Sequence, residues 1–224
     1  MSNVASNGSK LVSDIYNNIV TPGYTNLGTV AEYFSNYLLD ETDTLHIPIR
    51  GTQGWKDIKT DADLDLVKIP GGQVHHGAYK QYQELKDDFI RLAKVYRRKY
   101  IQSSNFKYKI NIYGHSMGTW LSILLLEDLY WMFPVNSEIN LFLYAPPNFC
   151  DVDYRDYLLN LLSKNINIKK FSYASSGDVI PRFPIGLHQI AHVNMLDFPD
   201  VDILDELGHH SIDNITNALI ELGL

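Results

Sequence analysis

The chain has 224 residues and a formal net charge of −7. An acidic protein of this kind is a poor partner for nucleic acid, and its charge also opposes long-range attraction to an anionic membrane. The net charge does not oppose transient contact with a neutral lipid surface. A chain of this length can bury one substantial core, so we expect a single domain over residues 1–224.

Cysteine usage and hydropathy bear on the compartment. Cys150 is the single cysteine, so no disulfide can form within the chain. The first ten residues lack the apolar centre of a signal peptide, and no apolar run has the length of a membrane span. These features are typical of an intracellular protein, and we expect that location.

The amino-terminal half begins with polar residues 1–10, which we expect to form a loose segment. An apolar stripe predicts a helix over residues 25–39. Residues 44–50 alternate as a strand does, and residues 52–75 have no clear period. Apolar residues then recur at steps of three and four, which predicts a long helix over 79–100.

The carboxyl-terminal half alternates between strand-like and helix-like segments. Strands are predicted over 108–113, 139–144, 166–173 and 192–196, and helices over 120–132, 154–162 and 211–222. Such alternation is typical of a mostly parallel central sheet flanked by helices. Ligands in these folds bind beyond the carboxyl ends of the strands.

The sequence Gly114-His115-Ser116-Met117-Gly118 lies between a predicted strand and a predicted helix. A serine between glycines at a strand-to-helix turn is the pattern of a nucleophile elbow, in which the backbone is strained and the hydroxyl is presented to substrate. The side chain of His115 must point away from Ser116, so we interpret it as a packing or hydrogen-bonding residue.

A serine nucleophile requires a base and a carboxylate that orients the base. Asp178 directly follows a predicted strand, and His209 and His210 precede the last predicted helix. The order Ser, Asp, His is that of the α/β-hydrolases. From the residues alone, either histidine of the pair remains a candidate for the base.

Several ordered segments resemble the class 3 lipases, the fungal triacylglycerol lipase type of α/β-hydrolase. They are Ile49–Thr52, Gln73–Tyr79, Leu141–Pro147, Asp178–Pro184 and His210–Asn214. The resemblance implies an α/β-hydrolase fold with Ser116 as nucleophile, Asp178 as acid and His210 as base. It also implies an oxyanion hole formed by the backbone amides of Thr52 and Met117, and it implies no metal or cofactor.

The segment that corresponds to the lid of this family differs from the expected pattern. Residues 53–65 are strongly charged, and their main apolar side chains are Trp55 and Ile58. We expect these two residues to contact substrate, but the charge argues against strong activation by a lipid interface. The interval from Asp178 to His210 is also shorter than the family implies.

These observations predict a serine carboxylic ester hydrolase, a lipase or esterase that cleaves acyl or lipid esters through an acyl-enzyme. Three alternatives remain at this point: a phospholipase A-type activity, transfer of the acyl group to another alcohol, and a non-catalytic binding or scaffold protein with the same fold. The presence of all three chemical groups in the proper order favours the hydrolase.

Overall fold

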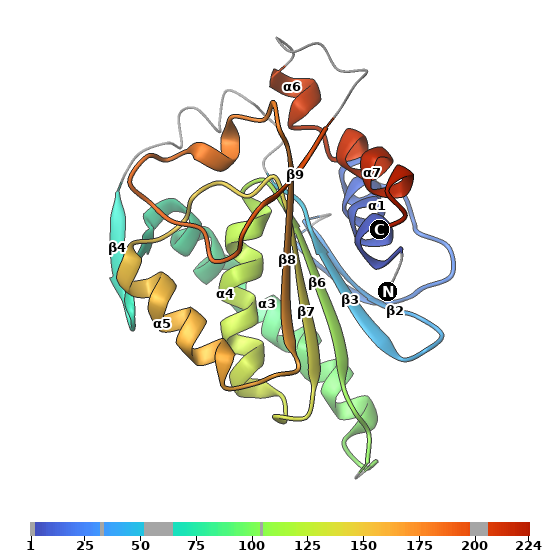
Figure 1. Ribbon diagram of the computed structural model, residues 1–224. Coiled ribbons are helices and arrows are strands. Elements are labelled where there is room, and N and C mark those ends of the chain that lie inside the picture. Colours follow the sequence, from blue (N-terminus) through green and yellow to red (C-terminus); the bar gives the residue numbers. More distant parts are fainter. Residues whose placement is uncertain (1–2, 32–33, 52–64, 104, 198–205) are drawn as a thin grey trace.

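The computed structural model describes residues 3–31, 34–51, 65–103, 105–197 and 206–224. Its centre is a seven-stranded sheet in the order β1-β2-β3-β6-β7-β8-β9 (Figure 1). Strands β3, β6, β7, β8 and β9 are parallel, whereas β1, β2 and β3 pair in antiparallel fashion. The mostly parallel sheet predicted from the sequence is therefore present.

The strands of this sheet are short. They are β1 (Thr25–Val30), β2 (Ser35–Leu39), β3 (Thr44–Ile49), β6 (Lys109–His115), β7 (Glu138–Tyr144), β8 (Ile168–Ser175) and β9 (Asn194–Leu196). A separate hairpin is formed by β4 (Leu66–Ile69) and β5 (Gly72–His75).

Helices cover both faces of the sheet. On one face lie α3 (His76–Tyr100), α4 (Gly118–Met132) and α5 (Val152–Ser163), and on the other lie α1 (Val4–Tyr16) and α7 (Ile212–Glu221) (Figure 1). The short helices η1 (Ile180–Arg182) and α6 (Glu206–His209) lie in the connections after β8. Both short helices lie at the end of the molecule at which the parallel strands finish (Figure 1).

Alternation along the strands separates two apolar layers. In β6, Ile110 and Ile112 face α3 and α4, whereas Tyr113 packs with Phe142 on the face of α1 and α7. Since both faces of the central strands are buried, almost every position in them excludes water. This buried frame holds the carboxyl ends of β6 and β8 in fixed positions.

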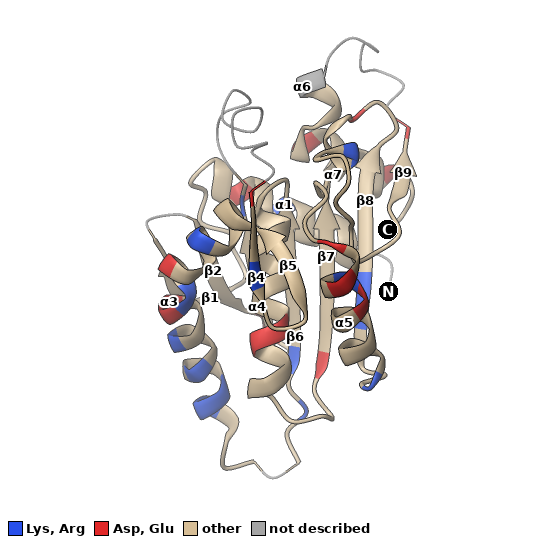
Figure 2. Ribbon diagram, turned by 90° about the vertical axis from the view of Figure 1, so that its left-hand side faces the viewer, with Lys and Arg blue, Asp and Glu red and all other residues tan. Residues whose placement is uncertain are grey.

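Helix α3 is amphipathic, and its basic residues gather in its carboxyl-terminal half (Figure 2). Arg97, Arg98 and Lys99 occupy its last turn, where positive charge complements the helix dipole. This basic end lies at the opposite end of the molecule from α6 (Figure 2).

The helix predicted over 25–39 is wrong, because Thr25–Val30 and Ser35–Leu39 form the antiparallel strands β1 and β2. Gly28 has a φ of 151°, a conformation that interrupts a helix and accommodates a register shift in the hairpin. In β2, Tyr37 packs into the core beneath α3 while Leu38 packs on the opposite face. A strand buried on both faces has a continuous apolar pattern that imitates a helical stripe.

The loose segment predicted over residues 1–10 is also wrong, because most of it belongs to α1. Small residues rather than large apolar ones are buried here. A side chain at Gly8 would collide with the ring of Tyr113, and Ser9 receives a hydrogen bond of 2.9 Å from Thr216 of α7. Glycine and serine look like surface residues in the sequence, yet here they permit the helix to approach the sheet closely.

The remaining predicted elements are confirmed with shifts of a few residues at their ends, and α3 begins three residues before its predicted start. The hairpin of β4 and β5 was not predicted, although Pro70 and Gly71 between its strands are a turn signal. Within the described ranges, none of the helices combines the length and apolar character that crossing a bilayer requires.

Candidate active site

Ser116 lies in the turn between β6 and α4, and its backbone is strained. Its φ is 54°, in the left-handed region that residues other than glycine rarely adopt. The turn is held from both sides: the N–H of Ser116 donates to the carbonyl of Tyr144, and its carbonyl accepts from the N–H and hydroxyl of Thr119. These bonds keep the serine in a conformation that costs about 1–3 kcal/mol in isolation.

Two glycines allow the strand and the following helix to come together at this turn. A Cβ at Gly118 would lie 2.5 Å from the carbonyl oxygen of Arg50. A Cβ at Gly114 would lie 2.5 Å from the hydroxyl of Ser122. The sequence motif therefore requires glycine at both positions for steric reasons.

Asp178 and His210 converge on Ser116 from two other connections. The Nε2 atom of His210 is 2.9 Å from Oγ of Ser116, and its Nδ1 atom is 2.7 Å from Oδ2 of Asp178. A carboxylate only accepts hydrogen bonds, so Nδ1 carries the proton, and Nε2 of the neutral ring accepts the serine proton. This tautomer is the one that a general base requires.

Asp178 is held where it can fix that ring. Its side chain is 1% exposed beside the His210 ring, and its second oxygen accepts the N–H of Ile180 at 2.9 Å. The carboxylate thus has a backbone donor on one oxygen and the imidazole on the other. Burial among these donors fixes its orientation.

His209, the competing candidate for the base, lies elsewhere. Its Nδ1 atom is 2.7 Å from the hydroxyl of Ser175, at the end of β8, and its ring lies against Gly177, where a Cβ would come within 2.5 Å of it. The two adjacent residues thus place one imidazole at Ser116 and the other at Ser175 and Gly177, just before Asp178 in the chain. The structure separates the two histidines that the sequence left as alternatives.

A second chain of hydrogen bonds runs beneath the site and includes Tyr16, which sequence reasoning did not identify. The Nε2 atom of His115 is 2.9 Å from the carbonyl of His210, and its Nδ1 atom is 3.0 Å from the hydroxyl of Tyr16. A carbonyl only accepts, so Nε2–H donates to it and Nδ1 accepts the Tyr16 proton. The Tyr16 oxygen in turn accepts the N–H of Gly51 at 2.7 Å.

This network has a defined charge state. Burial, reinforced by the nearby His210, lowers the pKa of His115 to about 3, so its ring is neutral at neutral pH. Burial also raises the pKa of Tyr16, whose hydroxyl therefore stays protonated. Uncharged groups of this network connect the end of β3, the serine turn and the backbone of His210. His115 therefore has the hydrogen-bonding role that we expected.

The other predicted site residues divide into two groups. Met117 follows Ser116 directly and caps the N-terminus of α4, where backbone amides and the helix dipole favour negative charge. Thr52, Trp55 and Ile58 lie outside the described residues. Gly51, which precedes Thr52, is described, and a Cβ there would lie 2.8 Å from that of Ser116.

The topology and the position of the site define the class of protein. The α/β-hydrolases place a serine at a strained turn after a central parallel strand, an acid after a later strand and a histidine near the end. The site described above has this arrangement. The structure resembles that of the Rhizomucor miehei lipase propeptide complex, with a TM-score of 0.69 at 18% identity over 87% of this chain and 68% of that one. It also resembles lipase II from Rhizopus niveus, with a TM-score of 0.65 at 16% identity over 86% and 76% of the two chains.

Sequence comparison narrows this class to one family. Residues 46–187 match the family model of lipase (class 3). The lipase of Rhizomucor miehei is 26% identical over 150 residues, which is 65% of this chain and 39% of that protein. The Rhizopus niveus lipase is 26% identical over 109 residues, 47% of this chain and 26% of that protein.

The chain belongs to the class 3 lipase family of α/β-hydrolases. It spans about two fifths or less of the length of these two relatives.

Proposed function

We propose that this protein hydrolyses fatty acyl esters, with Ser116 as nucleophile, His210 as general base and Asp178 as the residue that orients the base. The observation that carries the proposal is the continuous series of contacts from the serine oxygen through the imidazole to the buried carboxylate, at 2.9 and 2.7 Å. Membership of a lipase family supports acyl esters as the substrate class.

In the proposed reaction, Oγ of Ser116 attacks the ester carbonyl while Nε2 of His210 takes the serine proton. The resulting imidazolium is stabilised by Asp178 and returns the proton to the leaving alcohol, which leaves an acyl-serine. Water then attacks the acyl-serine with its proton passing to His210, and collapse of this second intermediate restores Ser116 and releases the fatty acid.

Negative charge develops on the carbonyl oxygen in both steps. We assign its stabilisation to the backbone amide of Met117, the residue after Ser116, and to that of Thr52, the two positions that match the oxyanion residues of the family. Support comes from the position of Met117 at the N-terminus of α4 and from the hydrogen bond that fixes Gly51, the neighbour of Thr52. Loss of one oxyanion donor typically costs about 3 kcal/mol of transition-state stabilisation.

Two exposed apolar side chains in the connection that carries Asp178 support an acyl substrate. Phe183 and Ile185 follow η1, in the connection that begins at Asp178, and they are 45% and 76% exposed. Exposed apolar groups of this kind are suited to contact with a hydrocarbon chain.

The proposal is tested with a fluorophosphonate probe and with hydrolysis of p-nitrophenyl esters of increasing chain length. Wild-type protein should be labelled and should turn over esters, and Ser116→Ala should abolish both. Ser176→Ala is a matched control, since Ser176 is an exposed serine at the same end of the sheet whose hydroxyl bonds Asp197. Folded wild-type protein that neither labels nor hydrolyses any ester would refute the proposal.

Emulsified triacylglycerol, monoacylglycerol and phospholipid should be compared next, with the products identified. Release of free fatty acid indicates hydrolysis. Transfer of the acyl group to an added alcohol in preference to water would instead assign the acyl-enzyme to an acyltransferase.

A further inference from the structure

A cavity of about 280 Å³ lies on the sheet face of α1 and α7, at the end of the strands opposite the candidate active site. It is bordered by the first residues of three strands, Thr44 of β3, Lys109 of β6 and Glu138 of β7. We call it the amino-end cavity. Its volume is close to the lower limit of about 300 Å³ for small-molecule sites, which restricts it to one slender ligand.

The cavity exists because α1 covers only part of this sheet face. The Tyr144 hydroxyl, at the carboxyl end of β7, donates to the carbonyl of Ala5 at 2.6 Å, and Gly8 packs against Tyr113 near the carboxyl end of β6. The amino-terminal turn of α1 therefore forms a wall where the covered half of the sheet ends. Leu224 completes this wall, and its carbonyl accepts the hydroxyl of Ser6 at 2.6 Å.

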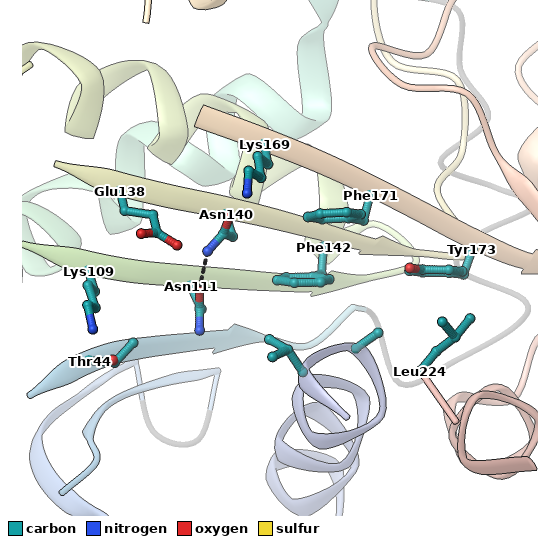
Figure 3. Close-up of a pocket in the computed structure, with 12 residues that line it drawn as sticks. Thr44, Lys109, Asn111, Glu138, Asn140, Phe142, Lys169, Phe171, Tyr173 and Leu224 are labelled. Carbon is teal, nitrogen blue, oxygen red and sulfur yellow. Dashed lines mark hydrogen bonds between the residues drawn. The ribbon is translucent and has the colours of Figure 1, made fainter. Parts of the chain in front are cut away.

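One half of the amino-end cavity is apolar and aromatic. Phe142 and Phe171 stack on adjacent strands with their ring centroids 4.9 Å apart and their planes at 14°, and Tyr173 continues the row (Figure 3). With the walls from α1 and Leu224, these rings form a slot that suits a hydrocarbon chain.

The other half is polar, and its free charge is positive. Lys109 and Lys169 border it, and neither forms an ion pair with the part of the chain that the structure describes (Figure 3). Glu138, the acidic residue of the lining, is engaged by Lys107 at 3.4 Å. Asn140 donates to Asn111 at 2.9 Å, so the amides between the two halves partly satisfy one another.

We propose that the amino-end cavity binds a single-chain carboxylate, with the chain along the aromatic slot and the carboxylate at Lys109 and Lys169. Charge complementarity selects an acid over a neutral or cationic amphiphile, since two lysines without ion-pair partners in the described structure border one end of an apolar slot. The residues that line the cavity support this ligand class whether or not Ser116 is catalytic. If the proposed function holds, the ligand class is also that of the fatty acid released by the reaction.

Isothermal titration calorimetry of the Ser116→Ala protein tests this with octanoate, 1-octanol and octylamine as probes. Octanoate should bind at least about tenfold more tightly than either of the others, because a charge-assisted contact is worth at least that factor. Equal binding of all three, or no binding of octanoate, would overturn the proposal.

Variants locate the site. Lys109→Gln combined with Lys169→Gln should weaken octanoate binding about tenfold or more, and Phe171→Glu should do the same by placing a carboxylate in the slot. Lys94→Gln, which removes an exposed lysine of α3 on the other side of the sheet, should have no effect. Octanoate binding that is unchanged in both cavity variants would place the acid elsewhere and refute the inference.

The two proposals can fail separately. The double lysine variant should keep wild-type labelling by fluorophosphonate, because both lysines are remote from Ser116. A protein that binds octanoate in the cavity but never labels would refute the esterase proposal alone, and one that labels but does not bind would refute the cavity proposal alone.

Discussion

The buried, neutral His115 should make the protein lose stability as the pH falls below about 6.5. Its pKa is lowered to about 3 in the folded protein, whereas the unfolded chain has the ordinary value of 6.5. Between these values the unfolded state binds a proton that the folded state does not, so the free energy of unfolding decreases with decreasing pH. Above pH 6.5 neither state binds it, and the contribution is constant.

The magnitude follows from the two values. Each pH unit inside the window is worth about 1.4 kcal/mol, so lowering the pH from 7 to 5 should remove about 2 kcal/mol through His115. For a chain of this size, such a loss lowers the melting temperature by about 4–8 °C.

The assay is urea unfolding at pH 5, 6, 7 and 8 for the wild type and for His115→Gln. Glutamine replaces the imidazole with a hydrogen-bonding amide that does not titrate, so the variant should lose about 2 kcal/mol less than the wild type between pH 7 and pH 5. His46, whose pKa is also lowered by burial, adds a dependence of the same sign to both proteins and cancels in the difference. Parallel stability profiles for the two proteins would refute the reasoning, whatever the absolute cost of the substitution.

Three further predictions concern the site. Tyr16→Phe leaves the N–H of Gly51 and Nδ1 of His115 without their partner, so it should cost about 2–4 kcal/mol of stability by urea unfolding and lower kcat. Tyr24→Phe is the matched control. Equal effects of the two substitutions would contradict the hydrogen-bond network. Gly118→Ala forces a Cβ to 2.5 Å from the Arg50 carbonyl oxygen. The rate of ester hydrolysis should therefore fall far more than it does for a substitution to alanine elsewhere in α4. A near-normal kcat would show that the close approach is not required. In a p-nitrophenyl ester assay, His210→Ala should lower kcat by about 10³-fold or more. His209→Ala should mainly lower the melting temperature. A large loss of kcat in His209→Ala but not in His210→Ala would exchange their roles.

Much of the central architecture could be predicted because its signals are local. The period of α3, the apolar strand that precedes Ser116 and the glycines around it are each contained in a short stretch of sequence. The reason for those glycines is equally local, because the turn leaves no room for a Cβ.

Where the sequence misled, the deciding partner was distant in the chain. The stripe over residues 25–39 suits a helix in isolation, but pairing of β2 with β3 places Tyr37 and Leu38 on opposite buried faces. Residues 1–10 lack large apolar side chains, yet Gly8 fits against Tyr113, which is about a hundred residues away in the chain.

The sequence by itself determined the family, the parallel sheet and the chemical types needed at the site, because repeated local patterns and ordered motifs carry that information. Only the tertiary structure decided which histidine of the adjacent pair faces Ser116, since the direction of each ring depends on packing against β8 and on the Asp178 turn. Only it revealed that Tyr16 joins His115 to Gly51 and that the sheet is left uncovered at the amino-end cavity. These features arise between elements, where the spacing of residues along the chain gives no indication of their distance in space.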